Sequence, residues 1–324
     1  MQATLPPYRD PLGETLHSLR MSGTLYCRCE FSAPWALALP AMHGFLMFHV
    51  VTSGNCWLEI DGDEPCLLSP GDLALVPHGN GHKLASEPGL PAPGLFDLSR
   101  EEVSKRYEIL RHGGGGAFTT MLCGAVHFDH PVAQHLVKLL PRVISVDAST
   151  SPESEWIQTT LRYMGAEARE LRPGGETVIT RLADILVIQA IRWWLGQNLA
   201  DQTGWLGALQ DEQIGRAISL IHREPARGWT VASLASELAM SRSAFAARFT
   251  TLVGETPMHF VARSRMYLAV TWIKEEQARL ADVAARLGYQ SEAAFSRAFK
   301  RFIGVSPGSV RRNKEMTSAT PLEY

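Results

Sequence analysis

The stretch SRSAFAARFTTLVGETP at 241–257 returns 50 residues later as SEAAFSRAFKRFIGVSP at 291–307. With this shift, seven positions between Trp229 and Pro307 are identical, and most of them are small, aromatic or turn residues. The identical pairs are Ala235 with Ala285, Ser241 with Ser291, Ala244 with Ala294, Phe245 with Phe295, Phe249 with Phe299, Gly254 with Gly304 and Pro257 with Pro307. Because a repeat of fixed period determines architecture, we expect two copies of one structural unit.

Each copy is predicted to hold a short helix, a tight turn, a second helix and a Gly-x-x-Pro stop. Phenylalanines four residues apart mark the inner face of each second helix. Gly288 stands where a left-handed turn residue is required, and Ala285 is small where the two helices would cross. The predicted helices are Asp211–Arg223, Val231–Leu238 with Thr230 as its cap, Ser243–Leu252, Met258–Ile273, Ala281–Leu287 and Glu292–Phe302.

This pattern resembles the DNA-binding domain of AraC/XylS-type transcription regulators. The motif runs from Asp282 through Gly288 and Phe295 to Pro307, and the inner residues and their spacing carry the resemblance. The resemblance implies two helix-turn-helix units on one face of double-stranded DNA. Their recognition helices would enter successive major grooves, which lie about 34 Å apart.

The outward positions of the two recognition helices differ in chemistry. In the second unit Arg297 is the best candidate for a bidentate contact to guanine, and Lys300 is expected to meet phosphate, which positions without specifying. Glu292 either accepts a hydrogen bond from cytosine or favours the helix N-terminus. The first unit offers mainly small side chains, so we expect the second unit to carry more of the sequence discrimination. The candidate DNA-binding residues are Arg242, Ser243, Ala246, Ala247, Arg248, Ser291, Glu292, Ala293, Ser296, Arg297 and Lys300.

The chain has 324 residues and a net charge of −2, but its charged residues are unevenly distributed along the sequence. The part from 205 to 315 has 16 Lys and Arg against 10 Asp and Glu, or +6, whereas 1–204 has 15 against 22, or −7. This asymmetry is typical of a protein that meets nucleic acid at one end. No apolar run is long enough for a membrane helix and no secretory signal is recognisable, so we expect a cytoplasmic protein without a membrane partner.

The N-terminal part is rich in short apolar runs separated by turn residues. Strands are predicted at Leu25–Phe31, Phe45–Thr52, Cys56–Ile60, Cys66–Leu68, Leu73–Pro77 and Thr119–Phe128, with 78–116 as a long surface excursion. The spacing Gly71-x5-Pro77-x-Gly79-x2-His82 resembles the second cupin motif, and His49 stands in a partial first motif. The part therefore resembles the cupin fused to AraC-type regulators, which implies an antiparallel β barrel with room for one small ligand or ion.

The cysteines and histidines of this barrel suggest two kinds of sensing. A set of His49, His82, Cys123 and Cys29 (or Cys27) would suit tetrahedral Zn²⁺, whereas the alternative is ordinary hydrogen-bonded histidines and buried thiols. Cys29 and Cys123 also match the thiol positions of related regulators that respond to reactive chlorine species. This resemblance implies redox sensing through Cys29 and Cys123, and Cys27 lies on the same strand face as Cys29.

The region 129–204 is predicted to be helical, either for dimerisation, as the family resemblance implies, or for packing on the barrel alone. We therefore expect a multidomain α+β chain: a cupin-like sensor at 1–128, a helical linker or dimerisation segment at 129–204, a double helix-turn-helix domain at 205–315 and a disordered tail at 316–324.

The expected function is sequence-specific transcription regulation in response to a small signal: an oxidant, a metal or an organic effector. RNA polymerase would be a partner of an activator, and a homodimer is possible in either case. The alternative is a metal-dependent cupin enzyme with a DNA-binding appendage. The incomplete first cupin motif argues against this enzyme.

Overall fold

The computed structural model describes residues 21–42, 44–104, 106–128, 137, 139–147, 154–170, 172–197, 205–209, 211–274 and 278–311. Contacts divide the chain into two compact units. One contains 21–128 and 136–198, and the other contains the C-terminal part from Leu199. The tail expected to be disordered at 316–324 lies outside the described residues.

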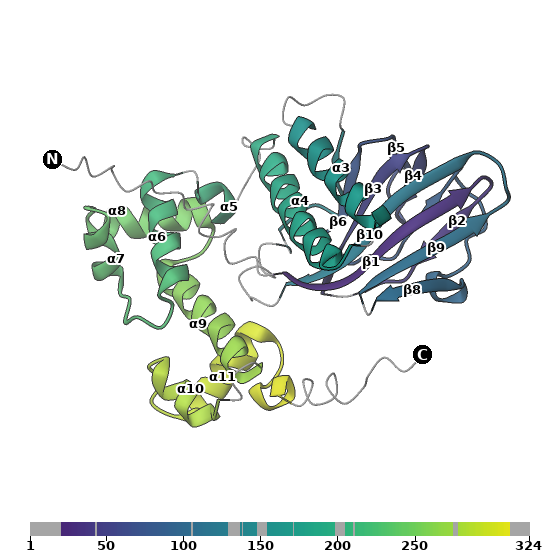
Figure 1. Cartoon of the computed structure of the whole chain (residues 1–324). Coiled ribbons are helices and arrows are strands. Elements are labelled where there is room, and N and C mark those ends of the chain that lie inside the picture. The colour runs from purple at the N-terminus through teal and green to yellow at the C-terminus, as the bar shows by residue number, and fades with distance from the viewer. Residues whose placement is uncertain are drawn as a thin grey trace. The chain divides into compact units, whose positions relative to one another are not determined.

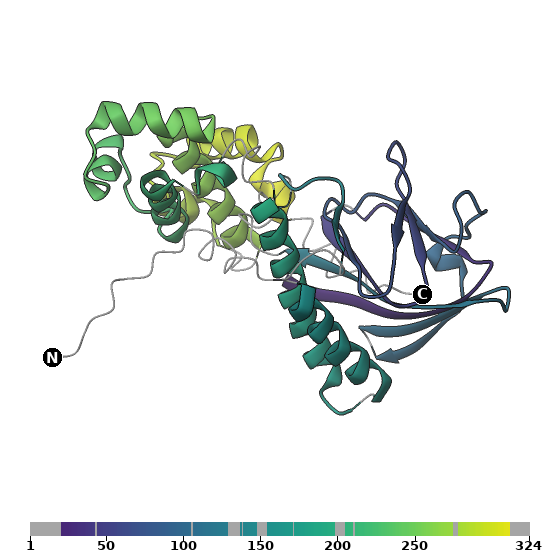
Figure 2. The same ribbon diagram turned by 90° about the horizontal axis from the view of Figure 1, so that it is seen from above.

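The first unit is built on two β-sheets (Figures 1 and 2). A seven-stranded sheet has the order β11-β6-β3-β10-β1-β9-β8, and a four-stranded sheet has the order β2-β7-β4-β5. The strands are β1 (Met21–Ser32), β2 (Ala36–Leu39), β3 (Phe45–Ser53), β4 (Cys56–Glu59), β5 (Cys66–Leu68), β6 (Leu73–Val76), β7 (His82–Ala85), β8 (Arg100–Ser104), β9 (Tyr107–Gly113), β10 (Phe118–Phe128) and β11 (Ile144–Val146), with a short 3₁₀ helix η1 (Leu95–Asp97).

The core of this unit lies where side chains from the two sheets meet. Along β3, Met47 and Val51 point into that core, while the alternate residues Phe48 and Val50 are buried on the other face of the sheet. The helices α3 (Ser154–Glu170) and α4 (Gly175–Gln197) cover that other face (Figure 1). The large sheet is therefore apolar on both sides, and this explains the nearly continuous hydrophobic run of β3.

The interpretation of 78–116 as a surface excursion is wrong. This segment contributes β7, β8 and β9, and β9 lies in the large sheet between β1, with which it pairs in parallel, and the edge strand β8. Its glycines and prolines fall largely between the strands, so their density conceals the strands when the segment is taken as a whole. Two further strands, β2 and β11, are also absent from the sequence prediction, and β11 pairs with β6 beyond the expected boundary at residue 128.

The second unit consists of helices. They are α5 (Trp205–Ala208), α6 (Glu212–Arg223), α7 (Val231–Glu237), α8 (Arg242–Val253), α9 (Pro257–Lys274), α10 (Leu280–Arg286) and α11 (Glu292–Ile303), followed by a helical turn at 307–311. The six helices predicted from the sequence are confirmed to within two residues at each end. Thr230 caps α7 as predicted, because its hydroxyl accepts a hydrogen bond from the Ser233 amide. Among the described helices, none has the length and apolar character to cross a membrane.

Candidate nucleic-acid interface and barrel interior

The recognition helices α8 and α11 are built on the same frame. Ser241 and Ser291 cap their N-termini, each accepting a hydrogen bond at 3.2 Å from the amide three residues later. Gly254 and Gly304 end the helices in the left-handed region with φ of 82° and 87°, where glycine avoids the strain of a side chain. The fully buried pairs Phe245–Phe249 and Phe295–Phe299 both have ring centroids 5.6 Å apart.

The two turns are not the same length. The last residues of α7 and α10 correspond at a shift of 49 residues, whereas α8 and α11 correspond at 50. Accordingly, Ala239 (φ 53°) matches Gly288 (φ 79°), and Gln290 is the additional residue of the second turn.

This change of register corrects the match between Ala235 and Ala285. Ala235 is buried and its carbonyl accepts from the Met240 amide. In the second copy Ala284 is buried, and its carbonyl accepts from the Tyr289 amide. Ala285 is exposed, so the small residue at the helix crossing is Ala284. The prediction of a left-handed turn residue at Gly288 is confirmed.

Most of the predicted DNA-binding side chains lie on the exposed faces of the two recognition helices. In α11, Arg297 is exposed and makes no ion pair or hydrogen bond within the described parts of the chain. The corresponding position of α8 is Ala247, which offers only a methyl group. The exposed candidates are Arg242, Ser243, Ala247, Arg248, Ser291, Glu292, Ala293, Arg297 and Lys300, and the half-buried ones are Ala246 and Ser296.

Arg248 differs from Arg297 because it is bound within the protein. Its Nε and Nη2 donate to Asp211 Oδ2 at 3.1 and 2.6 Å, and its Nη1 donates to Gln213 Oε1 at 3.1 Å. Asp211 also caps α6, while Gln213 donates to the Leu238 carbonyl at the end of α7. We call Asp211, Gln213 and Arg248 the polar clamp, since they connect α6, α7 and α8.

Arg265 is a second positioning residue that sequence reasoning missed. From α9 its guanidinium donates to the Pro225 and Arg227 carbonyls at 3.1 and 2.9 Å, after the end of α6. Arg265 also interacts electrostatically with Tyr289, in the turn between α10 and α11. Burial lowers its pKa. No spacing pattern marks such a residue, because its partners are carbonyls brought together only by the fold.

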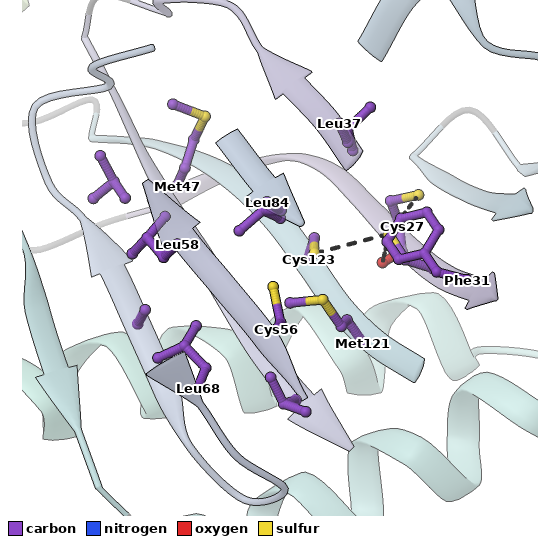
Figure 3. Packing of buried hydrophobic residues seen from close by; sticks show 14 of the residues in the cluster. Cys27, Phe31, Leu37, Met47, Cys56, Leu58, Leu68, Leu84, Met121 and Cys123 are labelled. Atoms are coloured by element: carbon purple, nitrogen blue, oxygen red, sulfur yellow. Dashed lines mark hydrogen bonds between the residues drawn. The ribbon is translucent and has the colours of Figure 1, made fainter. Parts of the chain in front are cut away.

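The interior of the barrel contains a group of three thiols. Cys29 Sγ lies 3.7 Å from Cys27 Sγ and 3.8 Å from Cys123 Sγ, because β1 pairs with β10 and all three residues face the core. Figure 3 shows Cys56 directed into the same interior as Cys123. The hydrogen bond to Cys123 and burial raise the pKa of Cys29. Burial also raises the pKa of Cys56, to about 12. These thiols are therefore protonated at neutral pH.

His49 and His82 form a separate pair in this interior. Their Nε2 atoms are 2.7 Å apart, and His82 Nδ1 lies 2.9 Å from the Asn80 carbonyl. Donation from Nδ1 of His82 to that carbonyl leaves its Nε2 as the acceptor, so His49 donates. Burial lowers the pKa of both rings, and the proximity of His82 lowers that of His49 further. His49 Nδ1 is buried without a partner.

The described residues contain no group of three or more His, Cys, Asp or Glu side chains arranged to hold a metal ion. His49 and His82 contact each other, and Cys29 and Cys123 contact each other, but the four do not form a tetrahedral ligand set as they stand. Zinc binding therefore remains a prediction.

Comparisons with known proteins agree with both units. A cupin family model matches residues 10–196, and a helix-turn-helix domain model matches residues 234–313. An AraC-like transcription regulator of Streptomyces lividans is 34% identical, covering 95% of this chain and 99% of the relative. The transcriptional regulator AlkR of Acinetobacter baylyi is 28% identical over 94% of this chain and 99% of its own.

A further relative is the RCS-specific transcriptional activator RclR of Escherichia coli, which is 25% identical over 93% of this chain and 97% of its own. These relatives are named as regulators and match along nearly their whole length, which decides against the cupin enzyme considered above. The chain belongs to the AraC-type transcription regulators that carry an N-terminal cupin domain, and it is a DNA-binding protein, not an enzyme.

Proposed function

We propose that the chain regulates transcription from the cytoplasm in response to an oxidant that reaches the interior of the cupin barrel. The contact of Cys29 Sγ with Cys27 Sγ and Cys123 Sγ, at 3.7 and 3.8 Å, carries this proposal. A disulfide requires an S–S distance of about 2.05 Å, so β1 would have to move against β10 to join Cys29 to Cys123. Cys27 lies on the same strand as Cys29 and is the alternative partner, and that pair would need a local change of β1 itself.

The protonated state of these thiols limits the oxidant class. Peroxides react with thiolates, and burial opposes the thiolate at all three cysteines. A strong electrophile such as hypochlorous acid suits the site better. It would transfer chlorine to one sulfur and release water, and a second thiol would then displace chloride with loss of a proton. The oxidant is thereby reduced and the two thiols become one disulfide.

Thiol counting on the full-length protein tests this proposal. One equivalent of hypochlorous acid should remove two thiols from the wild type and change the affinity for an operator fragment selected from random DNA. Cys29→Ser should abolish both effects. Cys66→Ser is the matched control, because Cys66 is only partly buried and does not belong to the cluster of Cys27, Cys29 and Cys123. Retention of the full response by Cys29→Ser would refute oxidant sensing at this site.

The same preparation tests the alternative signal, a metal. Elemental analysis before and after oxidation should show zinc leaving with the thiols if His49, His82, Cys29 and Cys123 rearrange to hold it. A metal-free protein that still responds to hypochlorous acid would restrict the signal to the thiols alone.

We also propose a homodimer formed through α3 and α4. These helices expose the large side chains of Tyr163, Val178 and Ile185 at 64%, 44% and 45%, and exposed apolar side chains that lie together can mark a protein–protein contact. A dimer would bring four reading helices to one operator, and an activator would bring RNA polymerase as a second protein partner. Ile185→Glu should shift the mass measured by light scattering to that of a monomer. An unchanged dimer would exclude these helices as the interface.

A further inference from the structure

A pocket of about 520 Å³ lies between α3 and the rim of the barrel, separate from the cluster of Cys27, Cys29 and Cys123. Small-molecule sites usually have volumes of about 300–1,000 Å³ and mostly apolar walls with a few polar groups. This pocket fits that description. Its lining residues are Val51, Thr52, Pro70, Gly71, Gln158, Leu161, Arg162 and Gly165.

The barrel side of the pocket is preformed. The Gly71 amide donates to the Val51 carbonyl at 2.8 Å, and the Val51 amide donates to the Asp72 carbonyl at 3.1 Å. The Asp72 carboxylate also accepts from the Ser69 amide at 2.7 Å, which closes the turn between β5 and β6. A wall held by these bonds keeps its shape without a ligand, so little ordering would oppose binding.

The helix side of the pocket contains a glycine that the packing of the protein does not require. Gly165 lies within α3, where glycine is less favourable than alanine. A Cβ at this position would meet no atom of another element within 4 Å. Because Gly165 has no side chain, the backbone of α3 is uncovered at this place, and a ligand could approach it closely.

One side chain supplies a positive charge at this pocket. The Arg162 guanidinium donates from Nη2 to Thr159 Oγ1 at 3.1 Å, and no carboxylate pairs with it in the described parts of the chain. Its remaining donors are available to an anion, and a planar guanidinium binds a carboxylate through two parallel hydrogen bonds. Apolar walls formed by Pro70 and Leu161 would contact the rest of such a molecule.

We infer that this pocket binds a small organic carboxylate with an apolar body, held by Arg162 and seated against Gly165. Its role as a second signal input rests on the proposed regulatory function, whereas the binding site itself does not. Because α3 packs on both β3 and α4, a ligand here would contact the barrel and the helical hairpin at once.

Titration of the full-length protein with phenylacetate and with its neutral isostere phenylacetamide tests the site, with calorimetry as the readout. Phenylacetate should bind in the millimolar range or tighter, and phenylacetamide at least tenfold more weakly. Arg162→Gln should weaken phenylacetate to the level of the amide. Gly165→Leu should weaken binding of both compounds, because its side chain would occupy the part of the pocket beside the helix backbone.

Gly196→Leu is the matched control, because Gly196 is also helical, has no other element near its Cβ position and lies away from the pocket. This variant should bind phenylacetate like the wild type. Equal binding of phenylacetate by Gly165→Leu and wild type, or no saturable binding of either compound by the wild type, would overturn the inference. Binding without any change in operator affinity would retain the site and reject its role in regulation.

Discussion

The two recognition helices share a scaffold but differ in what they present to DNA. In both, a serine cap, two buried phenylalanines and a left-handed glycine recur at the same places. On the outer face, α11 carries the unpaired Arg297 where α8 carries Ala247, while α8 carries the clamped Arg248 where α11 carries Ala298. The helix-turn-helix copy that contains α11 therefore has an arginine available to read bases. In the copy that contains α8, the arginine Arg248 instead connects the helices of the protein.

If the scaffolds are equivalent, removing the inner phenylalanine should cost the same in each unit. Phe249→Ala and Phe299→Ala should each lower the free energy of unfolding by about 3–5 kcal/mol, the usual cost of deleting a fully buried phenylalanine. Urea denaturation of the full-length variants, with hydrogen exchange to assign the loss to each unit, measures this. A difference of more than about 2 kcal/mol between the two variants would show that the scaffolds are not equivalent.

Substitutions at Arg297 in α11 and at the matching Ala247 in α8 test whether the two recognition helices differ in base recognition. Arg297→Ala should lose about 1–3 kcal/mol of binding to the selected operator and relax one base position, with little loss on random DNA. Ala247→Arg is the matched variant. It should strengthen binding to all sequences, because nothing selects the base that faces the new guanidinium. Binding measured on operator and random fragments checks both, and equal losses of Arg297→Ala on the two fragments would contradict base reading.

The polar clamp predicts a smaller and less specific effect. Arg248→Ala should lower the free energy of unfolding by at most about 1 kcal/mol, because the pair with Asp211 is half exposed and screened by solvent. DNA binding should weaken similarly on operator and random DNA. Arg242→Ala is the control on the same helix: it should weaken DNA binding without changing stability. A sequence-selective loss for Arg248→Ala would instead make Arg248 a base-reading residue.

How far the sequence predicts this structure depends on how local each feature is. The helices, the Thr230 cap and the left-handed Gly288 follow from residues within one or two turns of each other, and these predictions are confirmed. The common face of Cys27 and Cys29 also follows, from the alternation of a single strand. The contacts that need a partner far along the chain do not follow, as with Arg248 and Asp211, or Arg265 and the Pro225 carbonyl.

The additional residue Gln290 shows a different limit. A single shift of 50 residues aligns the recognition helices correctly and misplaces the helices before them by one position, because one inserted turn residue leaves most identities intact. Ala284 and Ala285 are both alanine, so the erroneous match still gives an identity. Similarly, the parallel pairing of β9 with β1 depends on a strand within a segment rich in glycine, where local composition favours a loop.

The corrected register makes a last prediction about the two turns. Ala239 and Gly288 occupy matching left-handed positions, and an L-residue there costs about 1–2 kcal/mol relative to right-handed backbone. Gly288→Ala should therefore destabilise the second unit by about 1 kcal/mol or more. Ala239→Gly should relieve that strain and so stabilise the protein. The greater freedom that glycine gives the unfolded chain offsets about 0.4–1 kcal/mol of this stabilisation. The free energy of unfolding should therefore rise by about 0.5 kcal/mol in Ala239→Gly, as measured by urea denaturation. Ala285→Gly is the control: Ala285 lies on the exposed helix face, so this change should only destabilise the protein. If Ala239→Gly destabilises the protein as much as Ala285→Gly does, the left-handed backbone of Ala239 holds no strain that glycine can relieve, and the two turns differ in energy although their conformations match.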